Sequence, residues 1–503
     1  MAVARTRTRI KGTKVYLRSY NEPAYDGQST GRRVRNWMPQ SGSINRLSLG
    51  NLRTVRSRCR DLERKVPWIA AAIDSYAANL IGAGIRPNSQ AHDDALRKHL
   101  NLLFSDWAEE ADADGIQDLH GLMAMAVRCI PTTGEMFFRF RYRRMSDNLS
   151  VPLQVQALEA DHVPIDMHKT LPNGGKIIAG IEFDQIGRRV AYHMYREHPD
   201  DVLTRALGGQ TVRVPTNEVI HFFPPLRPGQ VRGVPGLAPV MLRTRDLLEY
   251  EDAELVRKKT AAMFTAFVTK PDPDEDVFTD DDGGQFDPED EDDRGVGTTA
   301  LEPGTIQLLD VGEDIQFSTP ADVGGNYEAF MKMQLHAIAS AIGVTYDQMT
   351  GDVSEVNFSS IRAGLLEFQR RARQKQRLVV HQICRPIWHE WIRTAVLSGA
   401  IKMPGFVGAR NDQSRVTWVF PGWRYVNPKD EVEAAKAAVR AGFMSRAEVI
   451  AELGKDIEQV DEQIAKDNAS IDAKGFILDS DPRKTTEKGK TAAATNDVEG
   501  GEK

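Results

Sequence analysis

Cysteine is scarce in this 503-residue chain, whose three cysteines are Cys59, Cys129 and Cys384. They lie far apart in sequence, and none stands in a C-x-x-C pair. This spacing argues against a disulfide scaffold and against a thiolate zinc site. We therefore expect the protein to assemble in a reducing compartment, the cytoplasm of a cell.

Long hydrophobic runs are also lacking. The longest apolar stretch, from Pro67 to Gly84, is interrupted by Asp74 and Asn79, so we expect no membrane-spanning helix. The basic N-terminus has no apolar segment after it, which argues against a secretory signal. A membrane partner is therefore not expected.

The motifs of common enzyme classes are missing as well. A Gly-Lys-Thr sequence at 489–491 resembles the end of a phosphate-binding loop, but Lys484 occupies the position of the required first glycine. His389 is followed by glutamate as in zinc proteases, yet Arg393 stands where the second histidine is needed. No G-x-S-x-G, kinase or dinucleotide-binding glycine pattern occurs. We predict no enzyme activity, no cofactor and no metal.

Charge is plentiful but unevenly distributed along the chain, whose formal net charge is −6. Residues 271–293 hold thirteen acids and no base, whereas residues 1–60 hold fourteen lysines and arginines against two acids. Such segregation favours an anionic partner for the basic surfaces, although a flexible arm and a solvated loop without ligands would give the same pattern. The acidic run lacks the ligand spacing of an EF-hand, so no calcium site is predicted.

Hydrophobic periodicity predicts a multi-domain chain that mixes helices and strands. Residues 1–50 form a basic arm with little core, and helical periodicity begins near Leu52. Aromatic alternation at 137–142 predicts a strand, and further strand and hairpin signals follow it. Residues 51–235 are therefore expected to form one mixed unit.

Two helical patterns, 236–263 and 326–343, flank a segment that contains strand candidates at 305–309 and 314–317. This arrangement predicts two long helices that are separated by a small strand-bearing excursion. The excursion also contains the acidic run.

A polar loop at 344–358 precedes the longest helical pattern, 359–400. Pro386 should kink this helix near Gln382, whose carbonyl loses its hydrogen-bond donor. The first half of the helix is strongly basic. Against Glu367 alone, it carries Arg362, Arg370, Arg371, Arg373, Lys375 and Arg377.

The sequence after residue 400 predicts shorter elements. A strand is expected near 416–420 within the region 401–428, and helices are expected in the region 429–480. The polar tail 481–503 is expected to be disordered.

Five stretches, taken in order, resemble the lambda-type family of phage portal proteins. They are Leu62-Glu63-Arg64 leading to Ile81–Pro87; Glu218–Phe223 with Arg227–Gln230 and Arg232–Pro235; Tyr250–Leu255; Leu301–Gly304 with Gly312-Glu313; and Ile342–Tyr346 leading through Gly351-Asp352 to Asn357–Arg362. Any one of them is weak, but five matches at compatible spacings are specific. The long acidic segment departs from the pattern and looks like an insertion.

The resemblance implies an α+β, multi-domain portal fold and a ring, commonly of twelve subunits, around a DNA channel at one capsid vertex. Its implied regions are an α/β wing at 51–235, stem helices at 236–263 and 326–343, a small strand-containing clip at 264–325, a tunnel loop at 344–358, a long kinked channel-lining helix at 359–400, a wing strand region at 401–428 and a helical crown at 429–480.

The resemblance also implies three groups of site residues. The DNA-channel loop contributes Thr345, Tyr346, Asp347, Gln348, Asp352, Ser354, Glu355 and Asn357. The channel helix contributes the six basic residues named above. The clip, as the docking site of the packaging motor, contributes Lys270, Glu302, Gly304, Gly312 and Glu313.

The implied partners are further copies of the chain, double-stranded DNA bound without sequence preference, the terminase large subunit, a major capsid or scaffolding protein, and a head-completion or adaptor protein. The implied location is the virion, after assembly in the host cytoplasm. A monomeric nucleic-acid-binding phage adaptor or an enzyme of DNA metabolism would also explain the basic patches. A mass measurement and an ATPase assay separate these alternatives.

Overall fold

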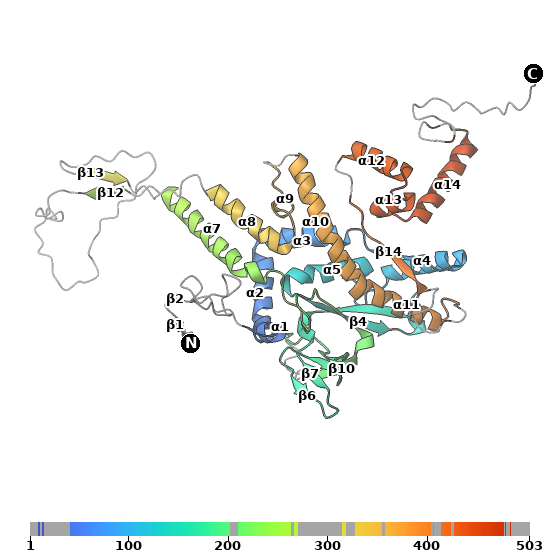
Figure 1. Cartoon of the computed structure of the whole chain (residues 1–503), viewed down its shortest axis with the longest axis horizontal. Coiled ribbons are helices and arrows are strands. Elements are labelled where there is room, and N and C mark those ends of the chain that lie inside the picture. Colours follow the sequence, from blue (N-terminus) through green and yellow to red (C-terminus); the bar gives the residue numbers. More distant parts are fainter. Residues whose placement is uncertain are drawn as a thin grey trace, which may run out of the picture.

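The structure is a computed structural model, and it describes most of the chain outside the two ends and the acidic region. The described residues are 9–10, 13–14, 41–201, 210–262, 266–269, 314–317, 327–354, 358–403, 406, 414–423, 427–476, 478 and 483. They combine helices and strands, as the sequence predicts (Figure 1).

The main body packs helices on one face of a small antiparallel sheet. The helices are α1 (Ile44–Ser48), α2 (Leu52–Lys65), α3 (Pro67–Ile81), α4 (Asp94–Glu109) and α5 (Leu119–Thr132). The sheet has the order β11-β4-β5, formed by β11 (Val219–Phe222), β4 (Met136–Tyr142) and β5 (Leu153–Leu158). Short 3₁₀ turns occupy 49–51, 145–147, 160–162 and 216–218. Because α1 and the first 3₁₀ turn lie at 44–51, the end of the expected arm is helical.

Strand β4 separates two hydrophobic cores because its side chains alternate between the faces of the sheet. Phe138 and Phe140 join the large helical core, whereas Phe137 joins a smaller core. The large core contains the fully buried Trp107, Trp388 and Trp391.

The smaller core is closed by a second sheet with the order β10-β9-β8-β7-β6. Its strands are β6 (Lys169–Thr170), β7 (Lys176–Ile178), β8 (Ile181–Phe183), β9 (Arg189–Tyr195) and β10 (Thr211–Pro215). Strands β8 and β9 form the hairpin that the sequence indicates.

A pair of helices projects from the body, on the left of Figure 1. After a 3₁₀ turn at 238–240, α7 runs over Met241–Ala262, and α8 runs over Tyr327–Ile342. The two helices pack together through Tyr250, whose ring stacks 5.9 Å from that of Tyr327. Beyond them, β12 (Ala266–Thr269) pairs antiparallel with β13 (Asp314–Phe317). The expected strand at 314–317 is therefore confirmed, while the candidate at 305–309 lies outside the described residues.

The expected long helix extends over Phe358–Leu397, and thus ends three residues before the predicted boundary. It consists of α10 (Phe358–Val379), a π-helical turn η7 (Val380–Cys384) and α11 (Arg385–Leu397). The irregular turn contains Gln382, where the lack of a donor on Pro386 predicts a distortion. The side-chain oxygen of Gln382 accepts a hydrogen bond of 3.0 Å from the N–H of Phe223, just after β11.

The C-terminal part returns to the body and then leaves it. Strand β14 (Val416–Val419) pairs antiparallel with β3 (Arg86–Ser89). Three helices follow: α12 (Pro428–Arg440), α13 (Arg446–Glu452) and α14 (Ile457–Lys474). They form a separate lobe at the upper right of Figure 1. Among the described residues, no helix is both long and apolar enough to cross a membrane.

Candidate functional site

The six basic residues of α10 do not share one environment. Arg370 and Arg371 are exposed by 80% and 57%, and both pair with Glu367, at 3.1 and 3.2 Å. This part of the helix therefore presents a solvent-facing cluster with a net positive charge.

Other cations of α10 face neighbouring elements. The Arg373 guanidinium lies over the Trp423 ring, 5.9 Å from its centroid. Arg362 lies 3.9 Å from Glu431 of α12. Lys375 is half-buried, and burial lowers its pKa, whereas Arg377 is exposed. The helix thus divides its charge between an open face and contacts with the C-terminal region.

The segment 344–358, predicted as a polar loop, contains a short helix, α9 (Tyr346–Thr350), which the sequence analysis did not predict. Thr345 and Gln348 form a capping box: the Thr345 hydroxyl accepts from the Gln348 N–H, and the Gln348 side chain accepts from the Thr345 N–H. Buried Met349 holds α9 in the large core.

Aromatic stacking also fixes α9 against the projecting helix α8. The Tyr346 ring stacks on His336 with 4.4 Å between centroids, and the Tyr346 hydroxyl donates to Asp352 at 3.3 Å. The first half of the loop is consequently rigid and coupled to α8.

The exposed tip of the loop lies at 352–354. Asp352 accepts from both the N–H and the hydroxyl of Ser354, at 3.0 and 2.6 Å, and these bonds lower the pKa of Asp352. Val353 is 60% exposed. The described tip is therefore anionic, while Glu355 and Asn357 lie outside the described residues.

The five clip residues Lys270, Glu302, Gly304, Gly312 and Glu313 also lie outside the described residues. In this region the structure describes the backbone of the β12–β13 ribbon, so the placement of those side chains stays a prediction.

Sequence reasoning missed the most elaborate polar cluster, which surrounds the fully buried Glu135. The Glu135 carboxylate accepts from Arg56 Nη2 at 2.6 Å and from Arg232 Nε at 2.7 Å. It also accepts from the Gly233 N–H at 2.6 Å and from His221 Nε2 at 2.9 Å. Three chain segments thus converge on one carboxylate.

The electrostatics of this cluster follow from burial and from the two guanidinium groups. Burial alone would raise the pKa of Glu135, but Arg232 and Arg56 outweigh it and hold that pKa well below its usual range. Burial lowers the pKa of His221 to about 4, so its ring is neutral near pH 7. The neutral ring donates from Nε2 to Glu135 and accepts at Nδ1 from Arg189, 3.0 Å away.

The cluster explains one stretch of the family resemblance, Arg232–Pro235. Gly134 has φ +81°, and a Cβ there would lie 2.3 Å from the carbonyl carbon of Val234. The backbones before Glu135 and after Arg232 therefore touch, which only glycine permits. In the sequence, this cluster is marked only by Gly134-Glu135 after a helix and by Arg232-Gly233 shortly before Pro235. The contact between the two pairs is long-range, so the sequence pattern did not predict it. The site is structural.

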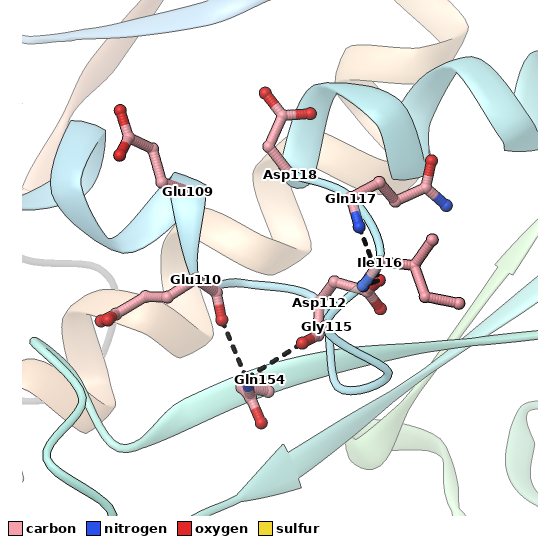
Figure 2. A pocket seen from close by; sticks show the side chains of 8 residues that line it. All are labelled: Glu109, Glu110, Asp112, Gly115, Ile116, Gln117, Asp118 and Gln154. Carbon is pink, nitrogen blue, oxygen red and sulfur yellow. Dashed lines mark hydrogen bonds between the residues drawn. The ribbon is translucent and has the colours of Figure 1, made fainter.

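An acidic pocket of about 420 Å³ lies between α4, α5 and β5 (Figure 2). Its lining residues are Glu109, Glu110, Asp112, Gly115, Ile116, Gln117, Asp118 and Gln154. Buried Asp112 accepts from the N–H groups of Ile116 and Gln117, at 3.0 and 3.2 Å. The Gln154 amide donates to the carbonyls of Glu110 and Asp112, both at 2.9 Å. These hydrogen bonds stabilise the loop between α4 and α5, and none of them pairs an acid with a base.

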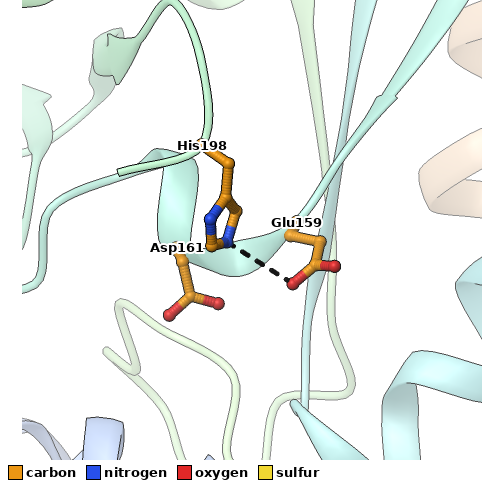
Figure 3. Close-up of side chains that lie close together, drawn as sticks. All are labelled: Glu159, Asp161 and His198. Atoms are coloured by element: carbon orange, nitrogen blue, oxygen red, sulfur yellow. Dashed lines mark ion pairs between the residues drawn. The ribbon is translucent and has the colours of Figure 1, made fainter. Parts of the chain in front are cut away.

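A second cluster brings Glu159, Asp161 and His198 together, with ligand-type atoms within 4.8 Å of one another (Figure 3). Such a set has the chemistry of a metal site. However, the Arg60 guanidinium donates to both carboxylates, at 2.9 Å for Glu159. Since Arg60 already pairs with both acids, the cluster is an ion-pair network.

The sequence profile described as "Phage portal protein, lambda family" matches residues 30–376. The chain belongs to the lambda family of phage portal proteins. Membership in a family of structural proteins confirms the expectation that this portal chain is not an enzyme.

Individual portal proteins are similar over most of the chain. The "Probable portal protein" of Halomonas phage phiHAP-1 is 26% identical over 423 residues, which cover 82% of this chain and 80% of the relative. "Portal protein B" of Escherichia phage lambda is 20% identical over 491 residues, 92% of each chain. A chain in the neck of a native gene transfer agent particle, computed with twelvefold symmetry, has 16% identity and a TM-score of 0.44, and the match covers 79% of this chain and 93% of that chain.

Proposed function

We propose that this portal-family chain forms a closed ring at one vertex of a phage capsid and conducts double-stranded DNA through its centre during packaging and ejection. The observation that carries the proposal is the projecting pair α7 and α8, which leaves a mixed α/β body and leads into a strand ribbon. This arrangement occurs within the part of the chain that the portal family matches.

In this proposal the body at 51–235 and the segment 401–428 form the wing. Helices α7 and α8 form the stem, 264–325 forms the clip, and α12 to α14 form a crown. The tunnel loop is 344–358, and α10 with α11 lines or approaches the channel. The packing of α9 on α8 supports a connection between stem and tunnel loop.

DNA has to slide through such a channel, so strong contacts would be a fault. Each phosphate neutralised by a cation releases counterions and makes binding more dependent on salt. Diffuse positive charge positions a duplex without reading its sequence. Exposed Arg370 and Arg371 supply such charge, while the anionic tip at Asp352 discourages tight capture.

The proposed partners follow from the same geometry. The clip would dock the terminase large subunit and later a head-completion or adaptor protein, and the acidic segment 271–293 would tune that docking by charge. The wing would contact the capsid or scaffolding protein, and the ring would help to start head assembly. The protein would assemble in the host cytoplasm and remain in the virion.

The central experiment measures the mass of the purified full chain by light scattering and its shape by negative-stain microscopy. We expect rings with a central hole, commonly of twelve copies in this family. A single globular chain that hydrolyses a nucleotide would refute the proposal and favour the alternative of a DNA-metabolism enzyme.

A second experiment tests the DNA-facing charge. The double variant Arg370→Gln/Arg371→Gln should reduce the slope of log affinity for duplex DNA against log salt, because fewer counterions are released. The control Arg188→Gln removes an exposed arginine of the β8–β9 turn that is likewise paired with an acid, Asp184. Equal slopes for the wild type and the double variant would place Arg370 and Arg371 away from the DNA.

A further inference from the structure

The long helix that ends at Leu397 exposes a row of arginines and histidines in its second half. Between 375 and 393 it exposes one residue per turn, and its other residues are buried or half-buried. We call the exposed residues the stripe, and they are Arg377, His381, Arg385, His389 and Arg393. None of them is acidic or apolar. By contrast, α4 exposes acids and bases together, among them Asp94, Lys98 and Glu109.

The π-helical turn η7 helps to keep the stripe on one side of the helix. Stripe residues are spaced by four, and in a regular α-helix this spacing drifts by about 40° at each step. Four such steps would carry the row towards the buried side. Because η7 holds more residues per turn than an α-helix does, it sets part of this drift back. The cations of α10 and those of α11 therefore share an open face.

The middle of the stripe is not neutralised within the chain. This stretch of the helix contains a single acid, Glu390, whose side chain is 13% exposed and pairs with Arg393 at 3.3 Å. In the part of the chain that the structure describes, no ion pair joins Arg377, His381 or Arg385 to an acid. Arg377 and Arg385 thus carry uncompensated positive charge, and His381 adds an imidazole donor between them.

The geometry of the stripe fits a regular polyanion. Four residues rise about 6 Å along a helix, so the stripe spans roughly 24 Å with one donor at each step. A DNA duplex carries one charge for about every 1.7 Å of its axis, so a row of cations meets phosphates in any register. A protein partner would favour apolar and aromatic residues at the centre of its contact, and the stripe has none. The ligand that fits is the backbone of duplex DNA.

We propose that the stripe binds the phosphate backbone of double-stranded DNA without reading its sequence. The inference rests on the proposed function, which brings DNA to the protein. It extends the DNA contact from Arg370 and Arg371 on α10 through η7 into α11. Arg377 lies about 28 Å along the helix from Phe358, which follows the tunnel loop. The stripe therefore holds DNA at a distance from the loop tip.

The first test is the double variant Arg377→Gln/Arg385→Gln. Duplex binding by the full chain is measured by fluorescence anisotropy over a range of salt concentrations. We expect the affinity at about 0.1 M salt to fall about threefold to tenfold, and the slope of log affinity against log salt to lose about 0.9 for each phosphate contact removed. Both side chains are exposed, so thermal unfolding of the variant should match that of the wild type.

The matched control is Lys169→Gln/Lys176→Gln, which removes two exposed cations from strands β6 and β7. The same number of charges is lost, so a general effect of net charge would weaken both double variants alike. We expect the control to bind DNA with the affinity and the salt slope of the wild type. Equal losses in the two double variants would overturn the inference.

The second test asks directly whether DNA lies at the stripe. Arg385→Cys labelled with an iron chelate should cleave the backbone of bound duplex without sequence preference, and labelled Lys176→Cys should not. The native Cys59 and Cys384 are buried and Cys129 is half-buried, and the wild-type chain treated with the same label gives the background.

The outcomes separate this inference from the proposed function. If rings form while Arg377→Gln/Arg385→Gln keeps the wild-type slope and labelled Arg385→Cys leaves DNA intact, the stripe is wrong and the ring stands. If no rings form but the double variant still loses affinity for DNA, the ring fails and the stripe stands. Unchanged DNA binding together with lost binding of a capsid or scaffolding protein would assign the stripe to an acidic protein and overturn the inference.

Discussion

At the residue scale, the buried charges around Glu135 are the positions where single substitutions should affect stability most. Arg56 and Arg232 have side chains that are almost completely buried, so both depend on Glu135 for neutralisation. Removing Glu135 leaves both buried cations uncompensated in the interior, which costs more than the intact group contributes. The same logic makes His221 sensitive to protonation, since Arg189 occupies its second nitrogen.

The variant Glu135→Gln should destabilise the fold strongly. It removes the negative charge but keeps the size, and we expect a loss of about 3–5 kcal/mol in the free energy of unfolding. Urea denaturation followed by circular dichroism measures this loss. The control Glu218→Gln affects a part-exposed acid 3.8 Å from Arg139, and should cost at most about 1 kcal/mol. Similar losses for both variants would contradict the account.

His221 should make stability depend on pH. In the unfolded chain a histidine titrates near pH 6.5, whereas in the fold the pKa of His221 is about 4. Between these values the unfolded state binds more protons, so stability is complete above about pH 6.5 and falls, by on the order of 3 kcal/mol, as pH drops towards 4. The pKa of Glu135 is also depressed, so its protonation adds a further loss below about pH 4.5.

The measurement compares urea midpoints at pH 7 and pH 5. His221→Gln removes the titrating group, so its midpoint should change less between the two pH values than that of the wild type. An unchanged pH dependence in this variant would show that other groups control the acid response.

At the scale of elements, the sequence predicted the long helices and their interruption well. Periodicity predicted a helix over 359–400, and the structure has it over Phe358–Leu397; the missing donor of Pro386 indicated the position of η7. The sequence analysis missed helix α9, although Thr345 and Gln348 have the spacing of a capping box. A single turn of that length depends on tertiary contacts, here Met349 in the core and Tyr346 on His336.

The pairing of strands was harder to predict from the sequence. Strand β14 pairs with β3, more than three hundred residues earlier, and β12 pairs with β13 across the acidic region. Local propensity contains no information about which distant edge a strand will join. For the same reason the Glu135 cluster could not be predicted, since each of its residues looks ordinary in its own segment.

The close contact between the segment before β4 and the segment at 233–234 gives a prediction about backbone geometry. Gly134→Ala places a Cβ 2.3 Å from the carbonyl carbon of Val234, so the two segments must separate. Gly187→Ala, at a similar φ of +83° but with nothing within 4 Å, is the matched control. We expect the control to lose about 1–2 kcal/mol and Gly134→Ala to lose clearly more, or to prevent folding. Thermal unfolding of both variants measures the difference.

The whole molecule consists of a packed body, a projecting helix pair and a C-terminal helical lobe (Figure 1). Composition indicated this uneven organisation through its segregated charge, and the family resemblance supplied the order of the parts. Composition could not show where the exposed cations and the anionic loop tip lie in the fold.

The loop tip gives a test at this scale. Deleting residues 347–353 would remove Met349 from the core, so the exposed Val353 is the better position. Val353→Lys adds one cation per copy at the tip, and we expect tighter, more salt-dependent binding of duplex DNA and slower passage during packaging. Val353→Gln is the neutral control. If Val353→Lys packages DNA at the wild-type rate, the tip does not contact the duplex.

The partners in the Glu135 cluster are far apart in sequence, and this separation affects when the chain can fold during synthesis. Arg56 precedes Glu135 by 79 residues, and Glu135 precedes Arg232 by 97. A nascent chain that has made only α2 therefore holds a cation without its acid, and one that stops before 232 holds the acid without its second cation. Early fragments are consequently unstable, and the body should not reach its native form before residue 233 has been synthesised.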